Sequence, residues 1–341
     1  MYKRQIKDFL DNKKFWKNVK PLFSDKGTMR QQICIVQGNQ IISDNKEVAE
    51  TFNKYFVHAI DSLQLKISPY LLNSRIYTSE FKDPIDIIIE EFASHPSILK
   101  IKEMVKVKQL SFKEINIDEI DYEISRLNPK KATTFGNIPT KIIKETKDIS
   151  APILHRIANS SMFINNQFPD KLKLPDVSPL LKGGDATDVK NYTPVSIPPP
   201  VSKIFERLIQ KQLLTHIDQY LSPYMCGYRK GYSAQYALVS LLEKWKESLD
   251  KKGYAGAMLM DLSKAFDTID HNLLIAKLHA YGLSRSALKL IKSYLSNRWQ
   301  RTKINTSFSS WTELKLGVPQ GSVLGPILFN IYLNNASCVQ Y

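Results

Sequence analysis

The stretch Tyr-Ala-Gly-Ala-Met-Leu-Met-Asp-Leu-Ser-Lys-Ala-Phe-Asp (Tyr254–Asp267) carries the most information about the fold. Its first seven residues, Tyr254–Met260, form a short apolar run that predicts a buried strand. The strand would end at Asp261, and a carboxylate there is costly unless a cation or hydrogen bonds compensate it. Metal-dependent phosphoryl transfer uses such strand-end carboxylates to hold divalent ions. The local pattern alone favours a plainer alternative, in which Asp261 caps a helix and Asp267 and Asp270 are surface acids.

A long basic region follows this stretch. No acidic residue occurs between His271 and Thr312, whereas seven basic residues do. A helix is expected to start at Ser284, with apolar residues on one face and basic residues on another. A basic face with tryptophans nearby suits a phosphate backbone and stacked bases, although a solvated helix face is the alternative. The residues expected to contact nucleic acid here are Arg285, Lys289, Lys292, Arg298 and Arg301.

A loop rich in glycine and proline comes next, with the sequence Gly-Val-Pro-Gln-Gly-Ser-Val-Leu-Gly-Pro (Gly317–Pro326). The glycines around Gln320 allow a ligand to approach the backbone closely, and the glutamine side chain offers both a donor and an acceptor. The apolar run Ile327–Leu333 follows. Taken alone, the pattern indicates only a turn before a buried segment.

Composition bounds the partners and the compartment. The 341 residues include 48 Lys and Arg against 33 Asp and Glu, which gives a net charge of +15. This excess favours a polyanionic partner, although a basic protein without a specific ligand has the same charge. The three cysteines form no metal-binding cluster. Because no signal core or membrane-spanning stretch is present, we expect no membrane partner and an intracellular location, nuclear or cytoplasmic.

The spacing of apolar residues and the positions of proline and glycine predict where helices and strands lie. Apolar residues at helical spacing predict helices at Glu47–Leu63 and Ile115–Leu127, and Asp44 with Glu47 resembles a capping box at the start of the first. Proline and glycine are dense between 169 and 200, so short strands and loops are expected there. Helices are expected again at about 201–219 and 234–250, the second beginning after Ser233.

The order of these motifs resembles the reverse transcriptases of non-LTR retrotransposons, the LINE-type and jockey-like kind. The resemblance rests on the pairing of Met260–Asp267 with Pro319-Gln320-Gly321. It extends upstream to a further set of motifs: Lys130-Lys131-Ala132-Thr133, Phe168-Pro169-Asp170, Leu181–Asp185, Asn191-Tyr192 and Cys226–Gly231. It covers about residues 115–335.

The resemblance implies a role for each matching residue in RNA-directed DNA synthesis. Asp261 would be the catalytic carboxylate that binds two Mg²⁺ ions, with the carbonyl of Leu262 as a further ligand. Phe266 would be the steric gate that excludes a ribose 2′-hydroxyl. Gln320 and Gly321 would contact the incoming nucleotide, Lys182 its triphosphate, and Arg229 nucleic acid. The implied partners are an RNA template, a DNA primer and deoxynucleoside triphosphates.

The implied fold is an α+β right-hand polymerase with helical fingers, a partial antiparallel palm sheet and no thumb. Its expected regions are a mostly helical N-terminal connector (1–110), the fingers (111–252) and a partial palm (253–341).

The sequence also departs from the family pattern. No aspartate follows Asp270, so the family's second catalytic motif, an aromatic residue before a pair of aspartates, is not present. Thr193 stands where the family has an arginine that clamps the triphosphate. We therefore expect a polymerase fragment that is inactive by itself. The alternatives are a non-catalytic RNA-binding remnant and, less well supported, a metal hydrolase built on Asp261, Asp267 and Asp270.

Overall fold

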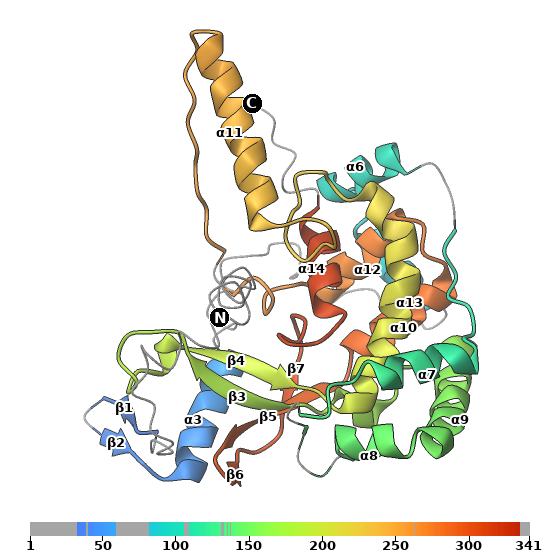
Figure 1. Ribbon diagram of the computed structural model, residues 1–341, viewed down its shortest axis with the longest axis vertical. Helices are drawn as coiled ribbons and strands as arrows, with labels where there is room; N and C mark the ends of the chain where they lie inside the picture. Colours follow the sequence, from blue (N-terminus) through green and yellow to red (C-terminus); the bar gives the residue numbers. More distant parts are fainter. Residues whose placement is uncertain are drawn as a thin grey trace, which may run out of the picture.

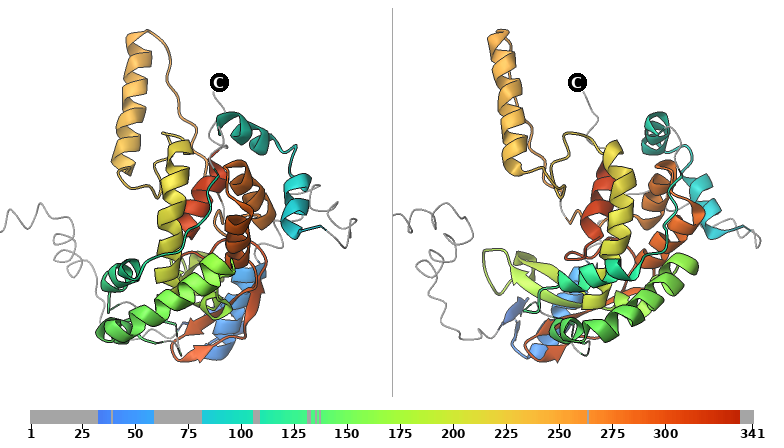
Figure 2. Two further views of the ribbon diagram at one scale, coloured as in Figure 1. Left: turned by 90° about the vertical axis from the view of Figure 1, so that its right-hand side faces the viewer. Right: turned by 45° about the vertical axis from the view of Figure 1, so that its right-hand side comes forward.

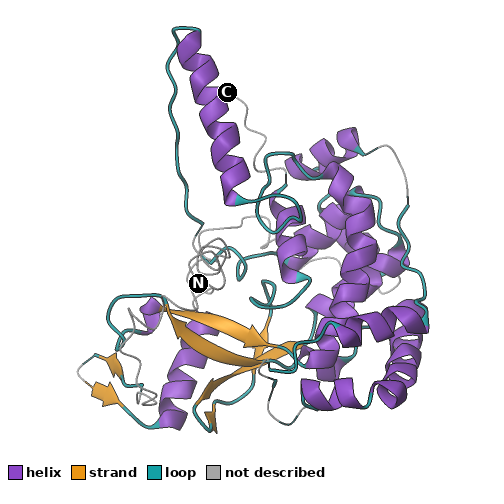
Figure 3. Cartoon of the chain, viewed as in Figure 1, coloured by secondary structure: helices purple, strands orange, loops and turns teal. Residues whose placement is uncertain are grey.

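The computed structural model describes residues 33–38, 40–58, 82–105, 109–130, 133–134, 136, 138–262 and 264–334. Its strands gather at one end of the molecule and most of its helices at the other (Figures 1 and 3). This separation of helices from a sheet confirms the α+β class. Three residues of the expected motifs lie outside the described residues: Lys131, Ala132 and Ser263.

The main sheet has five strands in mixed orientation. They are β3 (Asp176–Leu181), β4 (Tyr192–Ile197), β5 (Arg298–Ile304), β6 (Ser307–Phe308) and β7 (Thr312–Leu314). β3 pairs with β4 antiparallel and with β5 parallel, while β6 and β7 both pair antiparallel with β5. The strands expected between 169 and 200 are therefore confirmed. Within residues 253–341, where a partial antiparallel sheet is expected, β5 pairs antiparallel with β6 and β7, and β5 also joins β3 in parallel.

One face of this sheet is covered by helix α3 (Asn45–His58). Its Phe52 and Phe56 are buried with Val177, Tyr192 and Ile304 of the strands. The helix begins as expected, because an Asp44 carboxylate oxygen accepts a hydrogen bond from the Glu47 amide at 3.0 Å. The end of the expected helix, residues 59–63, lies outside the described residues. Before α3, strands β1 (Ile35–Gln37) and β2 (Gln40–Ile42) form a small hairpin.

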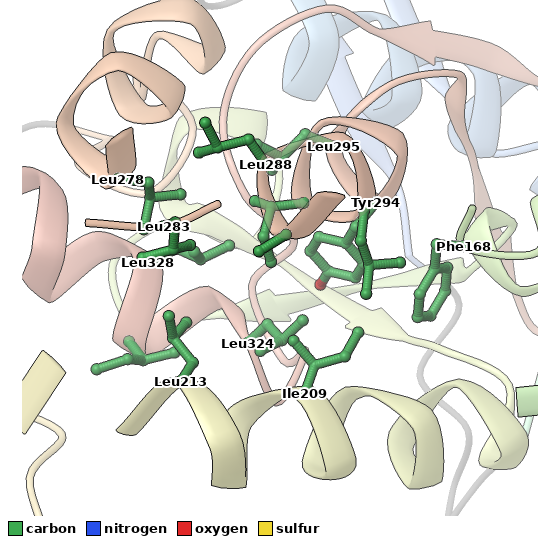
Figure 4. Close-up of a cluster of buried hydrophobic side chains, with 14 of the residues drawn as sticks. Phe168, Ile209, Leu213, Leu278, Leu283, Leu288, Tyr294, Leu295, Leu324 and Leu328 are labelled. Carbon is green, nitrogen blue, oxygen red and sulfur yellow. The ribbon is translucent and has the colours of Figure 1, made fainter. Parts of the chain in front are cut away.

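The larger core lies among the helices. α10 (Pro200–Ile217) packs against α7 (Ile117–Ser125) and α14 (Gly325–Leu333), and α12 (His271–Ala280) packs against α13 (Arg285–Leu295). Side chains from α10, α12, α13 and α14 converge in Figure 4. The remaining helices of this part are α5 (Pro84–Glu91), α6 (Pro96–Met104), α8 (Thr140–Glu145) and α9 (Lys147–Ile157). Helices were expected at the positions of α7, α10 and α13, and these expectations are confirmed.

Helix α11 (Ala234–Asp250) projects away from the rest of the molecule, and the chain returns beside it through residues 251–262 (Figures 1 and 2). The helix begins after Ser233 as expected, because the Ser233 hydroxyl oxygen accepts a hydrogen bond from the Tyr236 amide. None of its residues is buried. Its apolar side chains therefore do not contribute to the core.

The expected buried strand at Tyr254–Met260 is wrong. These residues have no regular structure and are exposed, with Leu259 94% accessible. A strand becomes stable when its backbone groups bond to a neighbouring strand and its side chains pack. No described strand of the main sheet pairs with residues 254–260. The run is apolar enough for burial, but the described residues give it no partner.

Lys277 on α12 is a buried cation in the helical core. Its ammonium donates a hydrogen bond to the Tyr332 carbonyl and lies 4.9 Å from the centre of that residue's ring. Burial lowers the pKa of Lys277 from 10.5 to about 8. Below pH 8 the folded protein must therefore hold a charge that the unfolded chain keeps in water.

Replacing Lys277 by methionine is expected to stabilise the protein by about 2 kcal/mol at pH 7, because the penalty of about 3 kcal/mol outweighs one lost hydrogen bond. Between pH 8 and 10.5 the unfolded chain binds more protons than the folded protein, so wild-type stability rises with pH. The advantage of the variant should therefore disappear by pH 10.5. Urea unfolding at pH 7 and pH 10.5 measures this, and an advantage independent of pH would contradict it.

Candidate functional site

The Gly317–Leu324 loop lies directly on the segment Lys264–Asp270, although the two are about fifty residues apart in sequence. The Val318 amide donates to the Phe266 carbonyl at 2.8 Å, and the Gly317 amide donates to the Ile269 carbonyl at 2.9 Å. The Gln320 side-chain amide donates to both carboxylate oxygens of Asp267, at 3.1 and 3.0 Å. Two motifs that were singled out separately in the sequence therefore form one structural unit.

Two glycines permit this contact. Gly317 has a φ of +78°, and a Cβ atom there would lie 2.7 Å from the Cα and carbonyl oxygen of Asp267. Gly321 has a φ of +109°, and its Cβ would lie 2.6 Å from the carbonyl oxygen of Ser196. In this structure both glycines allow a close approach of the chain's own backbone.

Asp267 is the acid at the centre of this unit. Burial raises the pKa of its carboxyl group, and the Gln320 hydrogen bonds and the charges of Lys264 and Lys182 oppose that rise. Burial also lowers the pKa of Lys264. Lys182, directly after β3, is exposed and close enough to act on Asp267 electrostatically. Residues 182, 266, 320 and 321 are thus brought to one region.

The ring of Phe266 is held by two other aromatic rings. It stacks on Phe329 of α14 with 4.6 Å between ring centres and 16° between planes. Tyr228 meets it edge-on at 5.6 Å. Both arrangements are favourable for aromatic pairs. Phe266 is therefore a fixed surface, and its position depends on residues far away in sequence.

Glu206 of α10 binds the end of the Gly317–Leu324 loop through hydrogen bonds. The side chain is fully buried, and one carboxylate oxygen accepts hydrogen bonds from the amides of Val323 at 2.6 Å and Leu324 at 3.1 Å. The other oxygen accepts from the Ser202 hydroxyl at 2.8 Å. The two amides precede α14, where the helix dipole favours a negative charge. On the opposite side, the Ser196 amide of β4 donates to the Gln320 carbonyl at 2.8 Å.

Asp261 does not lie at the end of a buried strand, and this expectation must be corrected. Both Asp261 and Leu262 are exposed in the irregular segment after α11. Within the described part of the chain, no group of three or more His, Cys, Asp or Glu residues could hold a metal ion. Mg²⁺ requires several oxygen ligands in near-octahedral geometry. Asp261 and Leu262 as placed therefore do not fit a two-metal site.

Two cations on the basic face of α13 form ion pairs with acidic residues. Arg285 pairs with Asp86 at 2.6 Å, and Lys289 pairs with Asp83 at 2.7 Å. Both acids belong to the α5 region, about two hundred residues upstream. Lys292 is partly buried, and burial lowers its pKa. Two of the three cations on this face are therefore paired with acids while their side chains remain largely exposed, and their contact with nucleic acid stays a prediction.

The arginines expected to bind nucleic acid have internal roles. Arg298 is 1% exposed and donates to the Tyr294 carbonyl at 3.0 Å. Arg301 pairs with Asp176 across the parallel β3–β5 contact at 2.8 Å. The Arg229 side chain is 6% exposed and donates to the Asp218 carboxylate and the Ser222 carbonyl. In this structure the three cations join chain segments, and their contact with nucleic acid stays a prediction.

Four residues of the unit were not identified from the sequence as part of it: Glu206, Tyr228, Asp267 and Phe329. Asp267 belongs to the same motif as Phe266, so its position indicates a place in the site, although the local pattern also allows a surface acid. Glu206 gave no signal, because a glutamate in an amphipathic helix is ordinarily solvated.

Comparisons with known proteins indicate the class of the chain. Residues 181–340 match the family model described as reverse transcriptase (RNA-dependent DNA polymerase). The chain is 31% identical over 221 residues to the RNA-directed DNA polymerase from mobile element jockey of Drosophila funebris, covering 64% of this chain and 24% of that protein. It is 28% identical over 232 residues to the probable RNA-directed DNA polymerase from transposon BS of Drosophila melanogaster, covering 67% and 25%.

A third relative, the probable RNA-directed DNA polymerase from transposon X-element of Drosophila melanogaster, is 33% identical over 168 residues, covering 48% of this chain and 18% of that protein. The chain therefore spans about a quarter or less of the length of these relatives. Among the described helices, none is both long enough and apolar enough to cross a membrane.

The family match identifies residues 181–340 as a reverse transcriptase domain, so by resemblance the class is that of the nucleotidyltransferases. Within that class, the chain is similar to the LINE-type RNA-directed DNA polymerases of jockey-like, non-LTR retrotransposons.

Proposed function

We propose that this chain supplies the nucleotide-binding side of a template-directed polymerase that copies RNA into DNA. The observation that carries the proposal is the double hydrogen bond from Gln320 to Asp267, which brings the Gly317–Leu324 loop onto the segment that bears Phe266. The partners proposed are an RNA template, a DNA primer and deoxynucleoside triphosphates. In this proposal residues 111–252 are the fingers, residues 253–341 are a partial palm, and residues 1–110 connect to them.

Each residue of the unit has a proposed role. Lys182 is an exposed cation near Asp267 and suits a triphosphate group. Phe266, held by Phe329 and Tyr228, supplies a rigid ring beside the sugar, where a 2′-hydroxyl would collide. The Gln320 and Gly321 backbone forms the surface under the base. The resemblance implies that the chemistry uses divalent ions, but Asp261 and Leu262 as placed do not form a site for them, so no role in metal binding is proposed for this arrangement.

Nucleotide binding and polymerisation are separable in this proposal. One exposed carboxylate carries too little charge to hold two Mg²⁺ ions. The 341 residues by themselves are therefore proposed to bind nucleotide and nucleic acid without extending a primer. The alternative, an RNA-binding remnant, would bind RNA but show no selective nucleotide site at Lys182.

Ultraviolet cross-linking of radiolabelled dTTP in the presence of Mg²⁺ tests the nucleotide site. Lys182→Ala is expected to lower the labelling at least about fivefold, because a charge-assisted hydrogen bond to the triphosphate is lost. Unlabelled dTTP should compete better than UTP because of Phe266.

Lys190→Ala is the matched control, since Lys190 is also exposed and lies in the connection between β3 and β4. It should leave the labelling unchanged. Equal loss in both lysine variants, or equal competition by UTP and dTTP, would refute the proposed site. Template-dependent primer extension by the same preparation would show that the proposed separation from catalysis is wrong.

A further inference from the structure

The segment Tyr220–Tyr236 contains a tyrosine at every fourth position, namely 220, 224, 228, 232 and 236. Three of these side chains face solvent: Tyr224 is 60% exposed, Tyr228 is 64% exposed and Tyr236 is 51% exposed. Exposed aromatic rings on a connecting segment are the usual platforms for unpaired bases. Of the basic residues that the sequence suggested for nucleic acid, Arg229 lies in this segment, 4.3 Å from the centre of the Tyr232 ring.

A hollow of about 220 Å³ lies between the start of α11 and the turn before it. Its walls include the rings of Tyr224 and Tyr236 and the side chains of Leu241 and Lys244. The Lys244 ammonium lies 4.1 Å from the centre of the Tyr224 ring. The volume is below the roughly 300 Å³ of pockets that take drug-sized ligands, and it suits one planar ring system.

Two lysines supply positive charge along this segment and at the hollow. Lys230 is exposed beside Tyr228, and Lys244 stands at the hollow itself. Aromatic walls with cations at the rim are the combination that binds a single strand through its bases and its phosphates.

The segment is held in place by polar contacts to the core. Asn330 of α14 donates a side-chain hydrogen bond to the Gly227 carbonyl at 2.8 Å, and the Ser222 amide donates to the Asn334 side-chain oxygen at 2.7 Å. Tyr228 has a φ of +57°, an unfavourable conformation for a bulky residue. Its ring edge contacts Phe266, so the tyrosine surface is continuous with the proposed nucleotide site.

We propose that Tyr224 and Tyr236 form a pocket for one unpaired nucleobase of a single-stranded nucleic acid, whose backbone follows Lys230 and Lys244 toward Phe266. The inference rests on the proposed function, because it assigns where the polymerase domain receives its strand. Neither tyrosine is part of the Gln320–Asp267 unit.

Fluorescence anisotropy with a labelled single-stranded oligouridylate tests the pocket. Tyr224→Ala and Tyr236→Ala are each expected to weaken binding about 5- to 100-fold, the range for loss of one base–aromatic stack. Tyr224→Phe and Tyr236→Phe should bind like the wild type, because the ring is retained. An oligonucleotide with abasic sites should bind the wild type as weakly as it binds the alanine variants.

Tyr122→Ala is the matched control, because Tyr122 is 62% exposed and has Arg126 above its ring, but it lies on α7. It should bind like the wild type. The pocket is refuted if Tyr224→Ala and Tyr236→Ala bind as tightly as the wild type, or if Tyr122→Ala weakens binding equally. A wild-type chain that binds no oligonucleotide refutes the proposed function as well. A parallel series with the matching deoxyoligonucleotide shows whether the pocket takes a base from RNA, from DNA or from either.

Discussion

Replacing Glu206 by alanine is expected to lower the free energy of unfolding by about 3–5 kcal/mol. The carboxylate is fully buried and accepts three hydrogen bonds, from Ser202, Val323 and Leu324. Alanine would leave all three donors without their acceptor, and each buried unsatisfied donor costs about 1–3 kcal/mol. Because two of the donors belong to the Gly317–Leu324 loop, dTTP cross-linking should fall together with stability. Urea unfolding monitored by circular dichroism gives the first quantity.

Two further variants distinguish the loss of the Glu206 carboxylate from the general effect of replacing a glutamate. Glu206→Gln keeps an acceptor oxygen but loses the charge beside the start of α14, so a loss of about 1–2 kcal/mol is expected. Glu90→Ala removes an exposed glutamate whose partner is Lys82 and should cost less than about 1 kcal/mol. If Glu206→Ala is no more harmful than Glu90→Ala, Glu206 does not hold the loop.

Replacing Gly317 by alanine is expected to cost at least about 3 kcal/mol. The left-handed conformation alone costs a side chain about 1 kcal/mol. The new Cβ would also lie 2.7 Å from backbone atoms of Asp267, which cannot move aside as a flexible side chain would. The loop must shift, and the hydrogen bonds from Val318 to Phe266 and from Gln320 to Asp267 should weaken with it.

Gly38→Ala isolates the contribution of the close approach. Gly38 has a φ of +63°, yet a Cβ there meets no atom within 4 Å. It should therefore show only the conformational cost of about 1 kcal/mol. Equal destabilisation by the two substitutions, measured by urea unfolding, would mean that the contact between Gly317 and Asp267 is looser than described.

The parts of the fold that the sequence predicted depend on local interactions. The helix starts after Asp44, Ser233 and Ser284 were found because a capping side chain and an apolar period lie within a few residues of each other. The strand at Tyr254–Met260 was predicted by the same local reasoning and is wrong. Whether an apolar run becomes a strand depends on a neighbouring strand, and local sequence does not contain that information.

The candidate site shows the same division. The sequence identified Phe266, Gln320 and Lys182 as members of one site, and the structure brings them to one region. The sequence did not reveal the partners of the basic residues of α13, because Asp83 and Asp86 lie about two hundred residues away. A stretch of sequence that lacks acidic residues can therefore still lie next to acidic residues in the folded protein.

The parallel contact between β3 and β5 has a consequence for how the chain is made. The ion pair between Asp176 and Arg301 joins residues 125 positions apart. At about 5–20 residues per second, a ribosome needs about 6–25 seconds to add that length. Throughout this interval the newly made β3 has one edge without its final neighbour, and such edges readily pair with other chains. Synthesis of this protein is therefore expected to pass through a prolonged stage in which the nascent chain needs protection from aggregation.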